Sequence, residues 1–94
     1  MSIGLLTIDL HLPGCASLKE KRSRLKPLLA RLHRELNVSE AEMDHMDAWQ
    51  EALIACALVS NDSSHVQRAL QHVAHWVDSS WPDVSLEDET IEIY

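Results

Sequence analysis

Apolar and polar residues alternate over the first dozen positions of the chain. Leu6, Ile8, Leu10 and Leu12 occupy every second position, and Thr7, Asp9 and His11 lie between them. A period of two predicts a β-strand over residues 3–12 with one fully apolar face. Pro13-Gly14 predicts the end of this strand.

The period changes to that of a helix after Ser17. Ser17 and Glu20 have the spacing of a capping box, which predicts a helix start. The leucines that follow fall on one side of a helical wheel; they are Leu18, Leu25, Leu28, Leu29, Leu32 and Leu36. Pro27 lies opposite them, where a bend toward solvent is tolerated. We therefore expect one kinked helix over residues 18–36, with Pro27 exposed.

Two strands and a turn are predicted next. Residues 38–44 form a short, half-polar pattern with Ala41 and Met43 on one face, and residues 45–48 are typical of a turn. Residues 49–60 are apolar on both faces through their middle, which indicates a central strand.

The last third of the chain predicts a second helix and a final strand. Residues 61–63 are rich in helix-capping side chains. Val66, Ala69, Leu70, Val73 and Val77 then recur at helical spacing, up to an end near residues 79–80. Trp81-Pro82 is a linker, and residues 84–94 form the last strand.

This order of elements predicts the architecture. Strand, helix, strand, strand, helix, strand within 94 residues is the ferredoxin-like order, and we expect one domain over residues 1–94. Right-handed crossovers give an antiparallel sheet of order 4-1-3-2 with both helices on one face. The acidic last strand fits an edge, where charge discourages the addition of further strands.

The charge of the chain is divided sharply. The net charge is −7, yet residues 17–34 contain seven basic residues and one acidic residue, and residues 35–94 contain thirteen acidic residues and one basic residue. The basic set is Lys19, Lys21, Arg22, Arg24, Lys26, Arg31 and Arg34. Such a patch makes the first helix a candidate for docking an anionic partner. The same asymmetry also favours self-association.

Several classes of protein are disfavoured. The sequence has no apolar run long enough to span a membrane and no signal-peptide pattern, so we expect a cytoplasmic protein. Cys15 and Cys56 do not form a disulfide framework or a CxxC pair. The chain has no Phe, and the outward positions of strands one and three lack aromatic residues, which excludes base stacking of the RNA-recognition-motif type. The small apolar sheet face instead favours a covering partner or a second copy.

Three segments are expected to converge at the end of the sheet where the first helix begins, namely residues 13–22, residues 44–50 and Trp81. The first is an anion site in which Ser17, Lys19, Lys21 and Arg22 surround the start of the helix, with Arg24 and Lys26 following. The alternative is a neutralised surface in which Glu20 and Asp44 or Asp47 pair with these bases.

The second segment is a polar turn, Asp44, His45, Asp47, Trp49 and Gln50. Its oxygen and imidazole groups suit a divalent cation or a general base, but an exposed polar turn is the favoured interpretation. Trp49 is interpreted as a cover for the end of the core, with a partner-facing anchor as the alternative. His72 and His75 have metal-ligand spacing without a third ligand. We accordingly predict no metal, no cofactor and no catalytic residue.

Four motifs resemble the YlxP-like family, a bacterial group of unknown function. They are residues 17–22 (SLKEKR), 37–42 (NVSEAE), 44–50 (DHMDAWQ) and 60–62 (SND), and they occur in order along almost the whole chain. The resemblance implies a ferredoxin-like fold. It also implies a role near the ribosome or RNA, because genes of this family often lie among transcription and translation factors. It brings no activity, cofactor or catalytic residue.

The leading hypothesis is a non-enzymatic binding module whose basic first helix docks ribosomal RNA or a translation-related protein. The first alternative is a homodimeric scaffold that uses the open sheet face. The second is the binding of a small anionic ligand, phosphate or nucleotide, between residues 13–22 and 44–50.

Overall fold

A computed structural model of the protein describes residues 1–44 and 48–94, with only the backbone at residue 44. The elements, in chain order, are β1 (Ser2–His11), α1 (Leu18–Leu36), β2 (Ser39–Asp44), β3 (Glu51–Ser60), α2 (Ser63–Ser80) and β4 (Ser85–Ile93). Each predicted element is present, with bounds close to those expected from the sequence.

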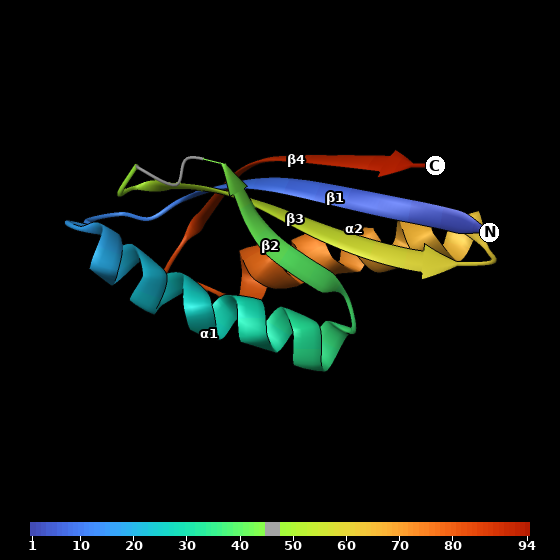
Figure 1. Ribbon diagram of the computed structural model, residues 1–94, viewed down its shortest axis with the longest axis horizontal. Helices are drawn as coiled ribbons and strands as arrows, with labels where there is room; N and C mark the ends of the chain where they lie inside the picture. Colours follow the sequence, from blue (N-terminus) through green and yellow to red (C-terminus); the bar gives the residue numbers. More distant parts are fainter. Residues whose placement is uncertain (45–47) are drawn as a thin grey trace.

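The four strands form one antiparallel sheet of order β2-β3-β1-β4, with both helices on the same face (Figure 1). This is the predicted ferredoxin-like arrangement, and β4 is an edge strand as expected. Helix α2 packs on β1, β3 and β4, whereas α1 lies along β2. The two helices therefore cover different parts of the sheet.

The core lies between the sheet and the helices. The apolar face predicted for the first strand is confirmed, because Leu6, Ile8, Leu10 and Leu12 are all fully buried. The sheet adds Ala52, Ile54 and Cys56, helix α1 adds Leu25, Leu28 and Leu32, and α2 adds Val66, Leu70, Val73, Ala74 and Val77. None of the helices within the described ranges is both long and apolar enough to cross a bilayer.

Helix α1 is a single helix with defined ends, as predicted. The Ser17 hydroxyl accepts a hydrogen bond from the Glu20 N–H at 3.1 Å, which is the capping interaction expected from the sequence. Asn37 ends the helix in the left-handed conformation, with φ of 53°. Pro27 is exposed inside the helix, on the side away from the leucines.

Helix α2 approaches β1 most closely at Gly4. A Cβ atom at this position would meet the Val66 side chain and would lie 2.7 Å from Leu70 Cδ1. The absence of a side chain at Gly4 therefore sets how close α2 lies to the sheet.

The two ends of the sheet differ. Both chain termini lie at one end (Figure 1). At the other end, Leu12 N–H donates to the Gln50 carbonyl at 2.9 Å, and Gln50 Nε2 donates to the Cys15 carbonyl at 3.3 Å. The segments after β1 and before β3 thus meet as predicted.

Candidate functional site

The basic residues of α1 divide into an internal set and an exposed set. Lys21 belongs to the internal set. Its side chain is only 2% exposed, and its ammonium lies 2.7 Å from Glu42 Oε2 and 2.9 Å from the Ala48 carbonyl that accepts its hydrogen bond. The prediction that Lys21 helps to form an anion site is therefore wrong, because the ammonium is buried, pairs with the Glu42 carboxylate and donates to the Ala48 carbonyl.

Arg24 is also used inside the protein. Its side chain is 15% exposed, and it donates to the Asp83 carboxylate at 3.1 Å, to the Asp83 carbonyl and to the Pro13 carbonyl at 2.9 Å. These bonds join α1 to the segment before β4 and to the segment after β1. Arg24 therefore acts as an internal connector rather than as the free anion ligand that the sequence predicted.

Arg31 holds the middle of α1 against the end of α2. Its guanidinium carbon lies 5.5 Å from the Trp76 ring centroid and 5.7 Å from that of Trp81. The two rings are 5.9 Å apart, and the guanidinium also pairs with Glu35 at 3.0 Å. Stacking of this kind is favourable for a planar cation. Trp81 accordingly lies beside the second half of α1, away from the helix start.

The exposed set forms one line on α1. Lys19, Arg22 and Lys26 follow each other at spacings of three and four residues, which places them on one side of the helix. All three are exposed, and none has an ion pair or a hydrogen bond to another side chain among residues 1–43 and 48–94. We call these three residues the basic stripe. Arg34 adds a further exposed base near the end of the helix.

Backbone N–H groups at the start of α1 donate hydrogen bonds to groups of the protein itself. The Ser17 hydroxyl and carbonyl accept hydrogen bonds from the N–H groups of Glu20 and Lys21. Ser17 is therefore a cap residue. The sequence prediction of an anion at this helix end gains no support from these contacts. Lys19, Arg22 and Lys26 are exposed, and their binding of an anion stays a prediction.

Strand β2 supplies the acids that the sequence analysis missed. Glu40 and Glu42 lie on the helix-facing side of β2, where Glu42 pairs with Lys21 and Glu40 lies 3.5 Å from His33 Nδ1. The signal was present in the sequence, because two glutamates two residues apart in a strand must share one face. The acid partners proposed earlier, Asp44 and Asp47, were placed in the turn instead.

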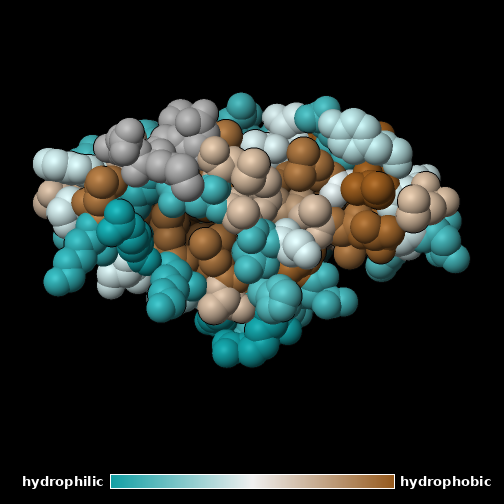
Figure 2. All heavy atoms as spheres, in the orientation of Figure 1, coloured by the Kyte–Doolittle hydropathy of each residue, from teal (hydrophilic) through white to brown (hydrophobic). Residues whose placement is uncertain are grey.

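A groove of about 380 Å³ runs beside the basic stripe. Leu25, Leu29 and Ala30 form its apolar floor, and its charged margin consists of Arg22, Lys26 and Glu42. Figure 2 shows apolar surface between α1 and β2, bordered by hydrophilic side chains. The groove thus combines an apolar floor with two cations and one carboxylate, and this carboxylate is paired with Lys21.

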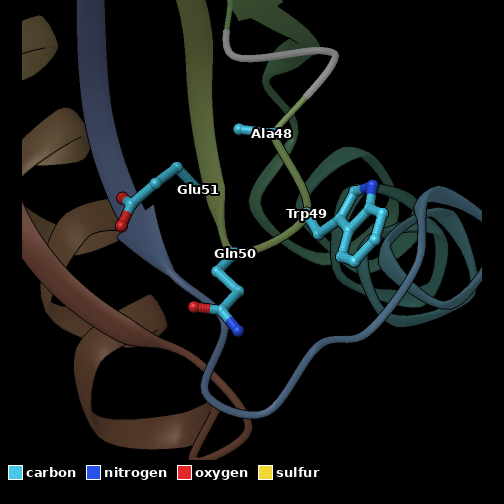
Figure 3. Close-up of a pocket in the computed structure, with 4 residues that line it drawn as sticks. All are labelled: Ala48, Trp49, Gln50 and Glu51. Atoms are coloured by element: carbon cyan, nitrogen blue, oxygen red, sulfur yellow. The ribbon is translucent and has the colours of Figure 1, made fainter.

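The polar turn gives a second, smaller feature. A pocket of about 370 Å³ is lined by the four residues from Ala48 to Glu51 (Figure 3). Trp49 is 52% exposed, so the interpretation that it mainly covers the core is wrong. Gln50 is tied to the Cys15 carbonyl. His45, Asp47 and the side chain of Asp44 lie outside the described residues.

The face of the sheet opposite the helices is largely apolar. The strand register pairs Leu5 with Ala57, Thr7 with Ala55 and Asp9 with Leu53, as expected for outward positions of adjacent strands. Ile3 is 40% exposed, and Met43 and Val59 are each 59% exposed. A hollow of about 270 Å³ on this face is lined by residues of β1, β2 and β3.

Both cysteines are free and buried. Burial, together with the negative charge of Glu40, raises the pKa of the Cys56 thiol to about 12. The thiol is therefore protonated at neutral pH and packs as an apolar group, in agreement with its place in an apolar strand.

Comparison with known proteins agrees with the resemblance in the sequence motifs. A family model described as "Protein of unknown function (DUF503)" matches residues 3–91. A protein of Bacillus subtilis (strain 168), described as "Uncharacterized protein YlxP", is 34% identical over 82 residues, which cover 87% of this chain and 88% of the relative. Because the match extends over nearly the whole chain, the protein belongs to the DUF503 family.

Proposed function

We propose that the protein is a non-enzymatic binding module that docks the phosphate backbone of RNA through the basic stripe, Lys19, Arg22 and Lys26. The observation that carries this proposal is the division of the bases of α1. Lys21, Arg24 and Arg31 are used within the protein, whereas the stripe is exposed and has no acidic partner among the described residues.

The charges elsewhere favour one orientation of the partner. The four strands contain no lysine or arginine and several acids, so their outer face repels a polyanion. The solvent side of α1, which carries the basic stripe, attracts one. The stripe extends about 10 Å along the helix axis, given a rise of 1.5 Å per residue, which suits contacts to successive phosphates of one strand.

The adjoining groove supports a nucleic acid rather than a simple anion. Arg22 and Lys26 lie at its margin, and Leu25 and Leu29 lie in its floor. A base or a sugar packs on such a floor while the neighbouring phosphates meet the cations, with little dependence on sequence. The gene neighbourhood implied by the family resemblance favours ribosomal RNA.

The test is a triple variant, Lys19→Gln/Arg22→Gln/Lys26→Gln. We expect it to lose co-sedimentation with bacterial ribosomal subunits and to bind a labelled single-stranded RNA more weakly. The slope of log K against log salt concentration should fall by about 2, because each lost phosphate contact removes about 0.7. Its fold should remain intact, since all three side chains are exposed.

The matched control is Ser64→Glu/Arg68→Gln/His72→Glu on α2. These residues are also exposed, and the variant changes the net charge by the same amount without touching the stripe. It should retain most of the RNA affinity and the full salt slope. Equal losses in both variants would show that net charge alone governs binding, and the proposed surface would then be wrong.

A second candidate function is a homodimeric scaffold built on the open sheet face. Met43 and Val59 are more than half exposed on this face, and the aliphatic side chains Leu5 and Leu53 lie between them on β1 and β3. Strands β2, β3 and β1 thus present a continuous apolar area with few charges.

A further inference from the structure

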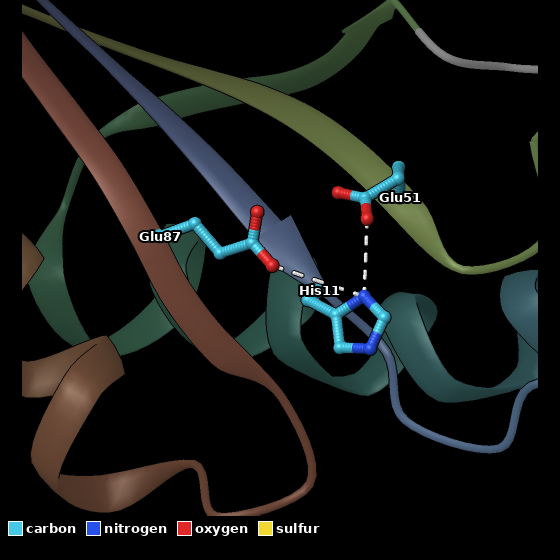
Figure 4. A group of neighbouring side chains, drawn as sticks. All are labelled: His11, Glu51 and Glu87. Carbon is cyan, nitrogen blue, oxygen red and sulfur yellow. Dashed lines mark hydrogen bonds and ion pairs between the residues drawn. The ribbon is translucent and has the colours of Figure 1, made fainter.

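Three side chains from three different strands converge on the outer face of the sheet, near the end where β1 leads into α1 (Figure 4). His11 Nδ1 lies 3.0 Å from Glu51 Oε1 and 3.8 Å from Glu87 Oε1. One ligand atom from each residue lies within 4.8 Å of those of the other two. We call these residues the His11 cluster.

A β-bulge places the third member. Asp9 pairs with Asp88 and Leu10 pairs with Leu86, so Glu87 is the extra residue in β4. Regular alternation would direct Glu87 toward the helices, because Asp88 next to it faces outward with Asp9. The bulge instead turns the Glu87 carboxylate toward His11, which pairs directly with Glu51 on the other side. Bulges commonly redirect a side chain at a binding site.

The surrounding charges favour a bound cation. Two carboxylates approach a single imidazole nitrogen. Like charges brought this close repel each other, and a cation between them removes the repulsion. The three strands that carry the cluster contain no lysine or arginine.

We propose that His11, Glu51 and Glu87 bind one divalent transition-metal ion, with Zn²⁺ as the best fit. Tetrahedral Zn²⁺ with bonds of about 2.05 Å sets neighbouring ligand atoms about 3.3 Å apart. The separations of 3.0 and 3.8 Å lie on either side of this value. An imidazole nitrogen with two carboxylates suits Zn²⁺, whereas Ca²⁺ and Mg²⁺ prefer oxygen ligands alone.

Such an ion has two consequences for the molecule. It cross-links β3 and β4 to the last residue of β1, which stabilises the sheet at the bulge. Three protein ligands also leave one coordination position for water. The side chains are between one third and one half exposed, so this position is accessible from solvent.

The experiment measures Zn²⁺ binding by the metal-free protein in competition with a chromophoric chelator. We expect one ion per chain, and a thermal midpoint that rises by about 10–20 °C when free Zn²⁺ is 100 times its Kd. Glu51→Gln and Glu87→Gln should each weaken binding by at least about tenfold. Co²⁺ should give the intense visible absorption of a four-coordinate site, and both variants should lose it.

Two controls separate this site from other binding. Glu92→Gln removes the same charge from β4 outside the cluster and should bind Zn²⁺ as the unmodified protein does. His72→Gln/His75→Gln should also retain binding; if it abolishes binding instead, the ion belongs to α2 and the proposal is wrong. Absence of Zn²⁺ binding by the unmodified protein, in a folded sample, would likewise overturn it. None of these outcomes depends on RNA binding.

Discussion

The basic residues of α1 show that the role of a lysine or arginine depends strongly on the residues around it. Lys21 is enclosed by Glu42 and the Ala48 carbonyl, whereas Lys19 and Lys26 on the same helix face solvent. A buried ammonium needs such partners, since leaving it unpaired costs several kcal/mol. The basic residues of α1 are therefore divided between those that hold the fold together and those that face solvent.

Cys56 predicts a specific dependence of stability on pH. Burial raises the pKa of its thiol from 9.0 to about 12 in the folded protein. Above pH 9 the unfolded chain releases this proton and the folded chain retains it. The contribution of Cys56 is therefore complete below pH 9 and is lost progressively as the pH rises toward 12. We expect urea denaturation to show a fall in stability between pH 8 and pH 10.5.

The Cys56→Ala variant separates this effect from other groups that titrate in the same range. Its stability at pH 8 should be lower, because a buried side chain is shortened. Its further loss between pH 8 and pH 10.5 should be smaller than that of the unmodified protein. Identical losses in the two proteins would exclude Cys56 as a source of the pH dependence.

The burial of some individual side chains could be predicted from the sequence. Lys21 lies three residues after Leu18 and four before Leu25, so it falls on the apolar side of α1. This spacing indicates burial, but the identity of its partner depends on the position of β2. Likewise, His11 and Glu51 pair through the register of β1 with β3, which a period of two does not give. Sequence patterns define faces, whereas partners require register.

At the level of elements, the two helices are held to the sheet in different ways. Helix α2 packs closely on β1 above Gly4, mainly through apolar side chains. Helix α1 adds polar connections from Lys21 to β2, from Arg24 to the segment before β4, and from Arg31 to two tryptophans. These connections account for the position of α1 along one side of the sheet.

Gly4→Ala should destabilise the protein by about 1–3 kcal/mol, the usual cost of overpacking a core. The added methyl group would overlap with Val66 and Leu70, so α2 would have to move away from β1. Chemical denaturation measures this loss. The double variant Gly4→Ala/Val66→Ala provides the control, since removal of the Val66 methyl groups makes room. Its loss should be smaller than the sum of the two single losses; simple additivity would contradict the proposed contact.

The order, type and approximate bounds of the elements could be predicted from periodicity alone. The helix cap at Ser17, the exposed Pro27 and the edge position of β4 were all predicted correctly. The bulge at Glu87 could not be predicted from the sequence, because it exists only in the pairing of β4 with β1. The acidic sequence of β4 indicated an edge strand, but it did not indicate which way any one carboxylate points.

On the scale of the whole molecule, the basic helix and the apolar sheet face lie on opposite sides. If the sheet face mediates a dimer, sedimentation should show a two-chain species that Met43→Glu/Val59→Glu converts to a monomer. Both side chains are more than half exposed, so the variant should fold normally. A stable pair typically buries about 800 Å² of accessible surface per chain, apolar and polar together.

The stripe variant Lys19→Gln/Arg22→Gln/Lys26→Gln distinguishes this dimer from association through opposite charges. A sheet-to-sheet dimer should persist in this variant and in high salt. If both conditions instead produce monomers, the contact is between the basic helix and an acidic strand. A protein that sediments as a monomer at high concentration would exclude both arrangements.

The internal connections of α1 have a consequence for the mechanics of binding. Lys21, Arg24 and Arg31 attach the helix to the rest of the fold at three levels of its length, and the exposed cations extend from this attached helix. If the stripe docks RNA as proposed, only a few long side chains need to be ordered, at about 0.5–1.5 kcal/mol each, and the helix itself does not. Such a surface would favour backbones whose charges already match its spacing over those that must first be rearranged.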